Sequence, residues 1–443
     1  MPRLTSISAE HFRCFSSRQT AHLAPLTFLV GANSTGKTSF LALLRELWNT
    51  VILGKFPDFT DAPYHLGIFH DIVSTNGDDQ RSKDVFTAEL TFVPNWENVR
   101  EITCSVEFRE RGGIPFPVSR IFAYGSVRIE LVIDNNKSHL IKCTTPSATW
   151  EVESKNLLVF EDRLDLVPIH HLMFELEHQE FGIRQAQMPV SSSNISLDGL
   201  KKLSRSLTQM HFMGKEPFAG APVRSRPRRT YDLGRPSTDP EGENIPTYLA
   251  SVKSRDRTTW NRMKRELESF GRNLGLFDSI NVSSLKGGAG GPFQIEIKRH
   301  GANEGSSSRN LIDVGYGVSQ VLPLLTELLR DGVADVCLLQ QPEVHLHPSA
   351  QAALGTLFTD VCSQKRQLIV ETHSDYLINR VRMDIRDRQC KIDEGDVSIL
   401  YFESIGDSVR IHSIRIDEMG NVLGAPPSYR RFFTAEADRE VQF

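Results

Sequence analysis

Eight residues near the N-terminus have the types and spacing of a phosphate-binding loop. Residues Gly31 to Thr38 read GANSTGKT and match the pattern GxxxxGK[ST] at every fixed position. Glycine lets the backbone curl so that its N–H groups surround an anion. Lys37 adds a mobile positive charge, and the Thr38 hydroxyl is a suitable ligand for Mg²⁺. These residue types predict a site for ATP and Mg²⁺.

The segments on either side of this loop are the ones that such a loop needs. The apolar run Leu26–Val30 predicts a buried parallel strand, and Ser39–Trp48 has helical character. A helix placed directly after the loop points the positive end of its dipole at the bound phosphate.

Three segments of the last third could complete the site. Val336–Glu343 is an apolar strand that leads to a carboxylate, Asp313–Gln320 is a glycine turn that opens a helix, and Leu368–Ser374 is a strand that ends near His373. Strands and helices alternate through this region, which predicts an α/β layered fold with a mixed sheet. The expected elements are helices at 318–329, 348–362 and 374–385, strands at 336–339 and 368–370, a hairpin of 397–402 with 409–416, and a strand pair of 293–298 with 310–314.

Composition excludes several classes of protein. The chain has 443 residues, 39% of them apolar, and a net charge of -4, so it is neither disordered nor basic over its whole surface. Any contact with nucleic acid must therefore be a local patch. The six cysteines form no CxxC pair, which indicates reduced thiols. No signal peptide and no apolar run of membrane-spanning length is evident, so we expect a cytoplasmic protein without a membrane partner.

The middle of the chain carries weaker signals. Alternating patterns at 86–92 and 127–133 predict antiparallel strands, and 169–212 looks helical. We therefore expect a discontinuous ATPase domain made of 1–50 and 213–443. Residues 51–212 would form a β-rich lobe that continues into a helical insertion or arm.

The order of these motifs resembles that of ABC-type ATPases, and more narrowly the branch that contains RecF, SMC and OLD proteins. Members carry an asparagine inside the phosphate loop, as at Asn33, and a Phe-Arg element after the first strand, as at Phe12 and Arg13. The run PEVHLHP at 342–348 and the run ETHSDYLINR at 371–380 are typical of the OLD-like branch. The resemblance covers about 4–50 and 215–435.

The resemblance implies a role for each motif residue. In such ATPases two subunits pack head to tail and enclose the nucleotide, so we expect a dimer or a higher homo-oligomer. His373 would sense the γ-phosphate, while His345 and His347 would have either a dimer-interface or a structural role. The residues implied for the nucleotide are Phe12, Arg13, Gly31, Asn33, Ser34, Gly36, Lys37, Thr38 and Ser39, with Gly315, Gly317 and Ser319 from the other subunit.

This sequence departs from the family at the end of the acidic strand. The positions of the Mg²⁺-associated carboxylate and of the water-orienting carboxylate are Gln340 and Gln341. Neither side chain accepts a proton. Glu343 is the nearest carboxylate, and we take it as the candidate base. Loss of a well-placed base slows the chemical step by roughly 10²–10⁴-fold, so the sequence predicts a slow or partner-activated ATP hydrolase in which catalysis involves Lys37, Glu343, Gln341 and His373.

A basic loop precedes the last third. Arg224, Arg226, Arg228 and Arg229 fall within six residues. They could contact the phosphates of DNA, bridge the loop to the nucleotide or a neighbouring subunit, or form a solvated loop. The sequence leaves these three interpretations open.

The resemblance favours one biological role. Compact OLD-like ATPases resemble the ATPase subunits of two-gene antiphage systems such as PARIS and Septu, in which a separate nuclease or toxin is the effector. The chain after His373 is too short for the Toprim nuclease of full OLD proteins. We therefore expect a sensor or scaffold subunit of a bacterial antiviral defence system. One alternative is a RecF-like repair ATPase that clamps DNA. Another is an ABC transporter motor, and the HLHP and ETHSDYL runs argue against it.

Overall fold

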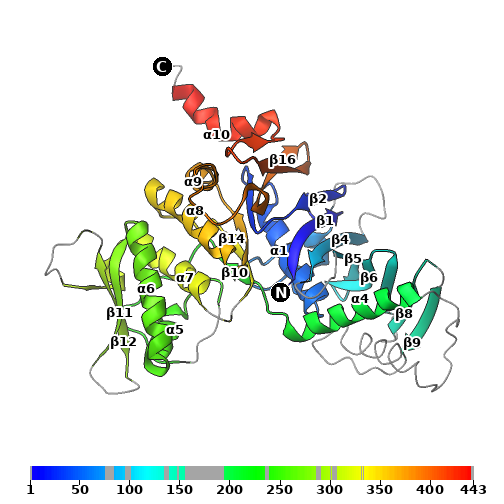
Figure 1. Cartoon of the computed structure of the whole chain (residues 1–443), viewed down its shortest axis with the longest axis horizontal. Coiled ribbons are helices and arrows are strands. Elements are labelled where there is room, and N and C mark those ends of the chain that lie inside the picture. The colour runs from blue at the N-terminus through cyan, green and yellow to red at the C-terminus, as the bar shows by residue number, and fades with distance from the viewer. Residues whose placement is uncertain are drawn as a thin grey trace. The chain divides into compact units, whose positions relative to one another are not determined.

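A computed structural model describes most of the chain (Figure 1). It places residues 2–74, 84–94, 101–133, 139–146, 149–154, 194–234, 239–285, 291–299, 301, 307–330, 332 and 334–440. Contacts divide the chain into two compact units. The first contains Met1–Ala24, Gly31–Glu216 and Leu400–Ser413, and the second contains Pro25–Val30, Pro217–Ile399 and Ile414–Phe443.

The first unit is built on an eight-stranded antiparallel sheet of order β2-β1-β4-β5-β6-β7-β8-β9. Its strands are β1 (Arg3–Glu10), β2 (Gln19–His22), β4 (Val85–Val93), β5 (Ile102–Arg111), β6 (Ile114–Tyr124), β7 (Val127–Ile133), β8 (His139–Thr144) and β9 (Thr149–Ser154). Its helices are α1 (Lys37–Leu47), which continues as a π-helical turn Trp48–Ile52, the short α2 (Phe69–Ile72) and α4 (Asn194–Met213).

Aromatic side chains fill the core of this unit. Along β4, alternate residues are buried, and the Phe86 ring stacks on Phe108 with centroids 4.6 Å apart. Such alternation places one face of a strand against the core, which is why the patterns at 86–92 and 127–133 predicted strands correctly. The indole N–H of Trp48 donates to the Lys215 carbonyl (2.9 Å) and so ties the end of α1 to the chain after α4.

A seven-stranded sheet has the order β10-β14-β15-β3-β16-β17-β18, and β3, β10, β14, β15 and β18 belong to the second unit, apart from Gly31, while most residues of β16 and β17 belong to the first. The first four run parallel, and β3, β14 and β15 are buried along their whole length. The strands are β3 (Leu26–Gly31), β10 (Phe218–Gly220), β14 (Val336–Gln340), β15 (Gln367–Glu371), β16 (Val397–Ile405), β17 (Ser408–Ile416) and β18 (Val422–Leu423). The accompanying helices are α7 (Tyr316–Leu329), α8 (Pro348–Ser363), α9 (Asp375–Arg386) and α10 (Pro427–Glu440), with a 3₁₀ turn at Glu394–Asp396. The predicted α/β fold with mixed sheets flanked by helices is confirmed.

A separate three-stranded sheet packs against two helices (Figure 1). It consists of β11 (Phe277–Ser284), β12 (Phe293–Arg299) and β13 (Arg309–Asn310), and α5 (Ile245–Arg255) and α6 (Arg257–Asn273) contact it. The predicted strand at 310–314 is wrong beyond Asn310. The Asn310 side chain accepts a hydrogen bond from the Ile312 N–H (3.2 Å) and starts a 3₁₀ turn, Leu311–Asp313, which ends the pairing with β12.

Two expectations extend past what the structure describes. The segment 169–212 was predicted to be helical. From Asn194 onward it lies in α4, and its earlier part lies outside the described residues. The domain boundaries drawn from the sequence stay a prediction. Among the residues that are placed, no helix is both long and apolar enough to cross a membrane.

Candidate functional site

The GxxxxGK[ST] loop lies between strand β3 and helix α1. The backbone is left-handed at Ser34 (φ 63°) and Gly36 (φ 81°), and Gly31 has a φ of 148°. A Cβ on Gly31 would stand 2.6 Å from the carbonyl oxygen of Phe402, so no other residue fits there without a backbone shift. Asn33 and Ser34 are exposed at the tip of the loop.

Lys37 is folded onto the loop that precedes it. Its ammonium donates to the carbonyl oxygens of Gly31 (3.0 Å) and Ala32 (2.7 Å), and the side chain is buried. Lys37 is also the first residue of α1, whose first turn contains no acidic residue. The positive end of the helix dipole is therefore not neutralised there, which suits an anion. Thr38 is partly exposed and Ser39 is buried in the same turn.

The Phe12–Arg13 element forms a tight turn. Phe12 and Phe15 exchange backbone hydrogen bonds of 3.2 and 2.9 Å, and Arg13 between them has a φ of 49°. The Phe12 ring is fully buried among aromatic side chains, so its part in a nucleotide site would be to hold this turn rather than to touch the ligand. Arg13 is partly exposed and donates to the Leu66 carbonyl (3.4 Å). Cys14 lies against the loop, with its Sγ 3.9 Å from the Thr35 carbonyl oxygen, and burial raises its pKa to about 11.

In the second unit, neighbouring parallel strands bring several predicted residues to one edge of the sheet. Gln340 at the end of β14 pairs in register with Glu371 at the end of β15, and Glu371 pairs with Leu29 of β3. Gln340 is buried. Gln341 turns away from the strand with a left-handed backbone (φ 41°), and its N–H donates to the Glu371 carbonyl (2.8 Å). Gln341 and the segment of His373 therefore leave the sheet side by side.

Glu343 joins these two segments. Its Oε1 accepts a hydrogen bond from the backbone N–H of His373 (2.8 Å), and its Oε2 is buried with no hydrogen-bond partner among the described residues. Burial raises the pKa of Glu343 above its usual value, while hydrogen bonds from His373 and Thr372 and the charge of Arg224 act in the opposite direction. Such a carboxylate holds a proton more readily than a solvated one.

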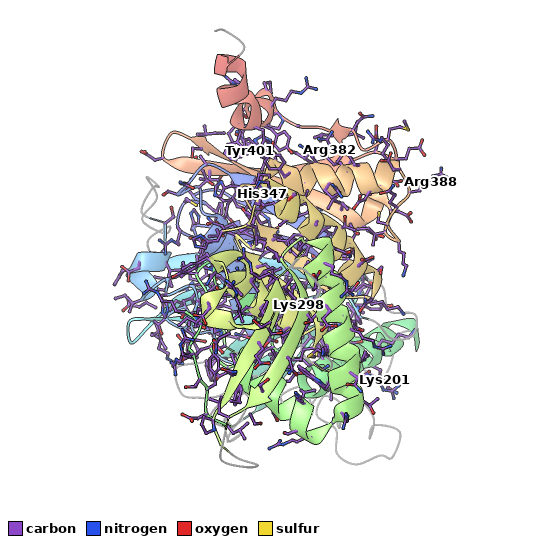
Figure 2. The ribbon with its side chains drawn as sticks, turned by 90° about the vertical axis from the view of Figure 1, so that its left-hand side faces the viewer. Lys201, Lys298, His347, Arg382, Arg388 and Tyr401 are labelled. Atoms are coloured by element: carbon purple, nitrogen blue, oxygen red, sulfur yellow. The ribbon has the colours of Figure 1, made fainter. Side chains whose placement is uncertain are left out.

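The glycine turn leads into α7 as predicted. Gly315 is the N-cap, Tyr316 is exposed, and a Cβ on Gly317 would stand 3.2 Å from the His345 carbonyl oxygen. The rings of Tyr316 and His345 lie 5.7 Å apart, so the start of α7 contacts the loop after β14. Ser319 is buried, and its hydroxyl donates to the Tyr316 carbonyl (2.9 Å). His347, labelled in Figure 2, is the N-cap of α8.

The four arginines of the basic loop have different surroundings. Arg224 is buried, so of the three interpretations left open, contact with DNA phosphates and a solvated position do not fit this residue. Its backbone is held by Gln320 of α7, whose amide accepts from the Arg224 N–H (3.2 Å) and donates to the Arg224 carbonyl (3.4 Å). Arg229 forms a two-pronged ion pair with Asp313 (2.9 and 2.7 Å).

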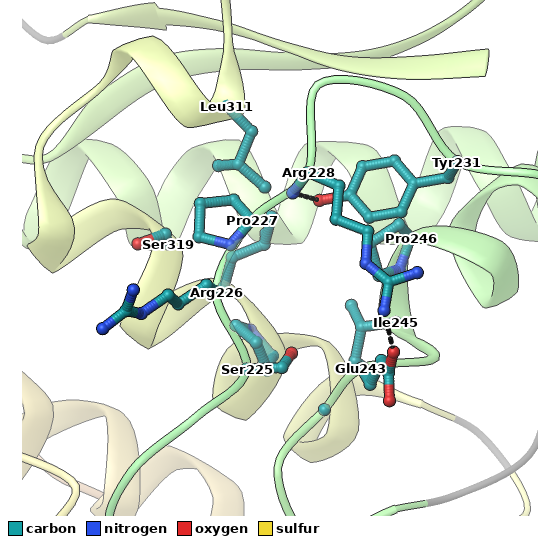
Figure 3. A pocket seen from close by; sticks show the side chains of 13 residues that line it. Ser225, Arg226, Pro227, Arg228, Tyr231, Glu243, Ile245, Pro246, Leu311 and Ser319 are labelled. Atoms are coloured by element: carbon teal, nitrogen blue, oxygen red, sulfur yellow. Dashed lines mark hydrogen bonds and ion pairs between the residues drawn. The ribbon is translucent and has the colours of Figure 1, made fainter.

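The other two arginines border a small pocket between the basic loop, the start of α5 and α7 (Figure 3). Arg228 pairs with Glu243, and its N–H donates to the Tyr231 hydroxyl (2.9 Å). The exposed Arg226 guanidinium points away from this pair (Figure 3). Two of the three exposed cations in the loop are therefore already balanced by carboxylates.

Sequence reasoning missed two features of these sites. Gln320 and Arg224 connect the basic loop to α7, and a run of arginines gives no signal that one of them is internal. Glu46 of α1 is buried as well, and burial raises its pKa to about 7. The nearly continuous apolar run FLALLRELW around Glu46 could have indicated this, because a helix that is apolar all round is buried all round.

The oxygen ligands predicted for Mg²⁺ are neutral. Thr38 offers a hydroxyl and Gln340 an amide oxygen, both of which are hard donors that suit Mg²⁺. Neither brings charge, so the phosphates would have to supply it. No cluster of three or more His, Cys, Asp or Glu side chains able to hold a metal occurs among the described residues.

The fold and the loop define the class: an α/β protein with a phosphate-binding loop between a buried parallel strand and a helix. Residues 216–379 match the family described as "AAA domain, putative AbiEii toxin, Type IV TA system". No curated protein matches the chain. Solved structures of SMC heads are similar at low identity. They include an Smc head with an extended coiled coil bound to a ScpA domain derived from Pyrococcus furiosus (12% identity, 99% of this chain and 100% of that chain, TM-score 0.45). Others are the SMC head domain from Thermotoga maritima (12%, 93% and 98%, 0.41) and an Smc head derived from Pyrococcus yayanosii (10%, 98% and 100%, 0.47).

Proposed function

We propose that this protein is an ABC-type ATPase that binds ATP and Mg²⁺ at its phosphate loop and hydrolyses ATP slowly or when activated by a partner. The observation that carries the proposal is the loop itself. Its glycines have the backbone that a phosphate cradle needs, Lys37 leads α1, and the first turn of α1 is free of acidic residues. The match of residues 216–379 to an AAA domain family supports the same reading.

The residues divide the work between binding and chemistry. Backbone N–H groups of Gly31–Lys37 and the Lys37 ammonium bind the β- and γ-phosphates, and Asn33, Ser34 and Ser39 complete the loop. Thr38 and the phosphates would hold Mg²⁺, which would supply positive charge to balance that of the transferred group. A water oxygen attacks the γ-phosphorus, its proton passes to the Glu343 carboxylate, and the bond to ADP breaks. Gln340 and Gln341 occupy the positions of the family's carboxylates and accept no proton. The well-placed base of the family is therefore missing, and turnover is slow.

A second copy of the chain completes the site in this proposal. Gly315, Gly317 and Ser319 at the start of α7 reach the γ-phosphate bound by a neighbouring subunit. Two observations support this. Gly315 and Tyr316 are exposed, and the first turn of α7 contains no acidic residue, so the positive end of this helix is available to an anion.

The biological role that we propose is that of a sensor or scaffold subunit in antiviral defence. The PEVHLHP and ETHSDYLINR runs support it, as does the family description of residues 216–379, which names a toxin of a type IV toxin–antitoxin system. A separate nuclease or toxin would be the effector, and the state of the nucleotide would set whether it is held or released. The balanced charges of Arg228 and Arg229 do not favour DNA clamping as the alternative.

The first test compares nucleotide binding and phosphate release in one preparation. The wild-type chain, Lys37→Ala and the exposed control Lys391→Ala are titrated with a fluorescent ATP analogue and Mg²⁺, and phosphate release is followed with ATP. We expect binding in the wild type and in Lys391→Ala, its loss in Lys37→Ala, and slow release throughout. Equal affinity in all three would refute the site, and fast release by the wild-type chain would refute slow turnover.

The second test addresses defence. The gene is placed with its chromosomal neighbours in a phage-sensitive bacterium, and plaque counts are compared for the wild type and Lys37→Ala. The proposal requires that protection depend on both Lys37 and a neighbouring gene. Protection that survives Lys37→Ala would contradict the part assigned to ATP.

A further inference from the structure

The second unit contains a buried arginine, Arg224, and a buried glutamate, Glu343. Arg224 is 5% exposed and Glu343 is 7% exposed. The two charges act on each other without forming a direct ion pair. The Arg224 Nη1 and the Glu343 Oε2 are each buried without a hydrogen-bond partner among the placed residues.

Hydrogen bonds hold the backbone of Arg224 and the carboxylate of Glu343. The Gln320 amide clamps the backbone of Arg224 with two hydrogen bonds, and Gln320 itself is buried in α7. Glu343 is fixed by the His373 N–H at the end of β15. Strand β10 pairs in parallel with β14, with Gly220 opposite Leu339, so the segments that carry Arg224 and Glu343 leave the sheet from neighbouring strands.

Uncompensated burial of either charge would be costly. A lone buried carboxylate protonates, and a lone buried cation is expelled or deprotonated. Burial indeed lowers the pKa of Arg224 to about 10, with the Glu343 charge acting in the opposite direction. Each group therefore makes the charged form of the other tolerable inside the protein. The groups that act on Glu343 are the His373 N–H, its own backbone N–H, the Thr372 hydroxyl and Arg224, and Arg224 is the one full positive charge among them.

We propose that Arg224 is a positioning residue for Glu343: its buried positive charge balances the carboxylate, and its backbone couples that carboxylate to α7 through Gln320. The inference rests on the proposed function for its meaning in catalysis, since an ionised Glu343 can take a proton from water and a protonated one cannot. It also gives Arg224 a role that differs from those of the exposed arginines in the same loop, Arg226, Arg228 and Arg229.

The test follows the ionisation of Glu343 directly, so it needs no turnover. The protonated carboxyl band in the infrared spectrum of the full chain is titrated, and Glu343→Gln identifies the contribution of this residue. Arg224→Met removes the charge at similar length, Arg224→Lys keeps it, and Arg226→Met is the matched exposed control. We expect the band of Arg224→Met to persist to a pH higher by about one unit. Arg224→Lys should be near the wild type and Arg226→Met unchanged.

Further measurements separate a structural effect from an electrostatic one. Denaturation midpoints of Arg224→Met, Glu343→Gln and the double variant form a cycle, in which the double variant should recover much of what either single variant loses. Where phosphate release is measurable, the acidic limb of its pH profile should shift upward in Arg224→Met while the ATP affinity holds. An unshifted carboxyl titration in Arg224→Met, or additive losses in the cycle, would overturn the inference. Failure of the wild type to bind ATP would refute the proposed function instead and leave the titration result intact.

Discussion

Gly36 offers the sharpest test of how the phosphate loop is built. The residue has a φ of +81°, and a Cβ added to it would stand 2.3 Å from the Cys14 Sγ and 3.4 Å from the Phe15 ring. The left-handed backbone costs a non-glycine residue about 1 kcal/mol. Forcing an extra carbon into the packed space costs about 1–3 kcal/mol more. Gly36→Ala should therefore destabilise the chain by about 2–4 kcal/mol.

Two further variants separate these contributions. Gly112 has a φ of +62° and open space around its missing Cβ, so Gly112→Ala should show the backbone cost alone. Cys14→Ala removes the sulfur that blocks the new carbon, and in the Gly36→Ala background it should restore stability to the level of Gly112→Ala. Urea denaturation followed by circular dichroism measures all four chains. If Gly36→Ala is no worse than Gly112→Ala, or if Cys14→Ala brings no recovery, the packing of Cys14 against the loop has been misread.

Other predictions concern single groups. Because burial raises the pKa of Glu46 to about 7, its neutral form favours folding: stability should fall as pH rises from about 4.5 to about 7, and Glu46→Gln should flatten that slope in thermal melts at several pH values. Asp256 caps α6 by accepting from the N–H groups of Thr258 and Thr259 (both 3.0 Å), so Asp256→Ala should lower the melting temperature and Asp256→Asn should retain most of it. Glu343→Gln should reduce phosphate release by roughly 10²-fold or more at unchanged ATP affinity, and unchanged release would remove Glu343 as the base. Any affinity for duplex DNA should depend only weakly on salt, with a log–log slope near that of about one phosphate contact, and gel shifts at several salt concentrations would reveal a steeper one.

The parallel part of the sheet could be predicted from the sequence for a physical reason. Strands β3, β14 and β15 are buried on both faces, so each appears as a short unbroken apolar run bounded by glycine or polar residues. The helices that follow β14 and β15 begin at recognisable caps, such as Ser374 of α9, whose hydroxyl accepts from the Leu377 N–H. Burial, periodicity and capping agree locally here, and the elements were found within a few residues.

Other elements depend on contacts that a linear pattern does not contain. Strand β11 was missed because its alternation, Phe277, Ile280 and Val282 buried among polar neighbours, is broken by an irregular register between Phe277 and Ser279. Strand β13 was predicted too long because a single hydrogen bond from the Ile312 N–H to the Asn310 side chain diverts the chain. In both cases one local backbone or side-chain feature sets the extent of the strand, and the amino-acid composition of the segment does not reveal it.

The buried charges at the candidate site show the same limit. A sheet edge of this kind gains nothing in stability from Arg224 and Glu343, because a buried pair that makes no direct ion pair recovers little of its desolvation cost. Apolar side chains of similar size would pack there at lower cost. In our proposal, the Glu343 carboxylate accepts from the His373 N–H, while Gln320 of the helix that a second subunit would use holds the backbone of Arg224, and this arrangement suits proton transfer that depends on assembly. In this proposal, Gln340 and Gln341 stand in place of the family's carboxylates, and Glu343 is the carboxylate whose charge responds to how α7 and the basic loop are held.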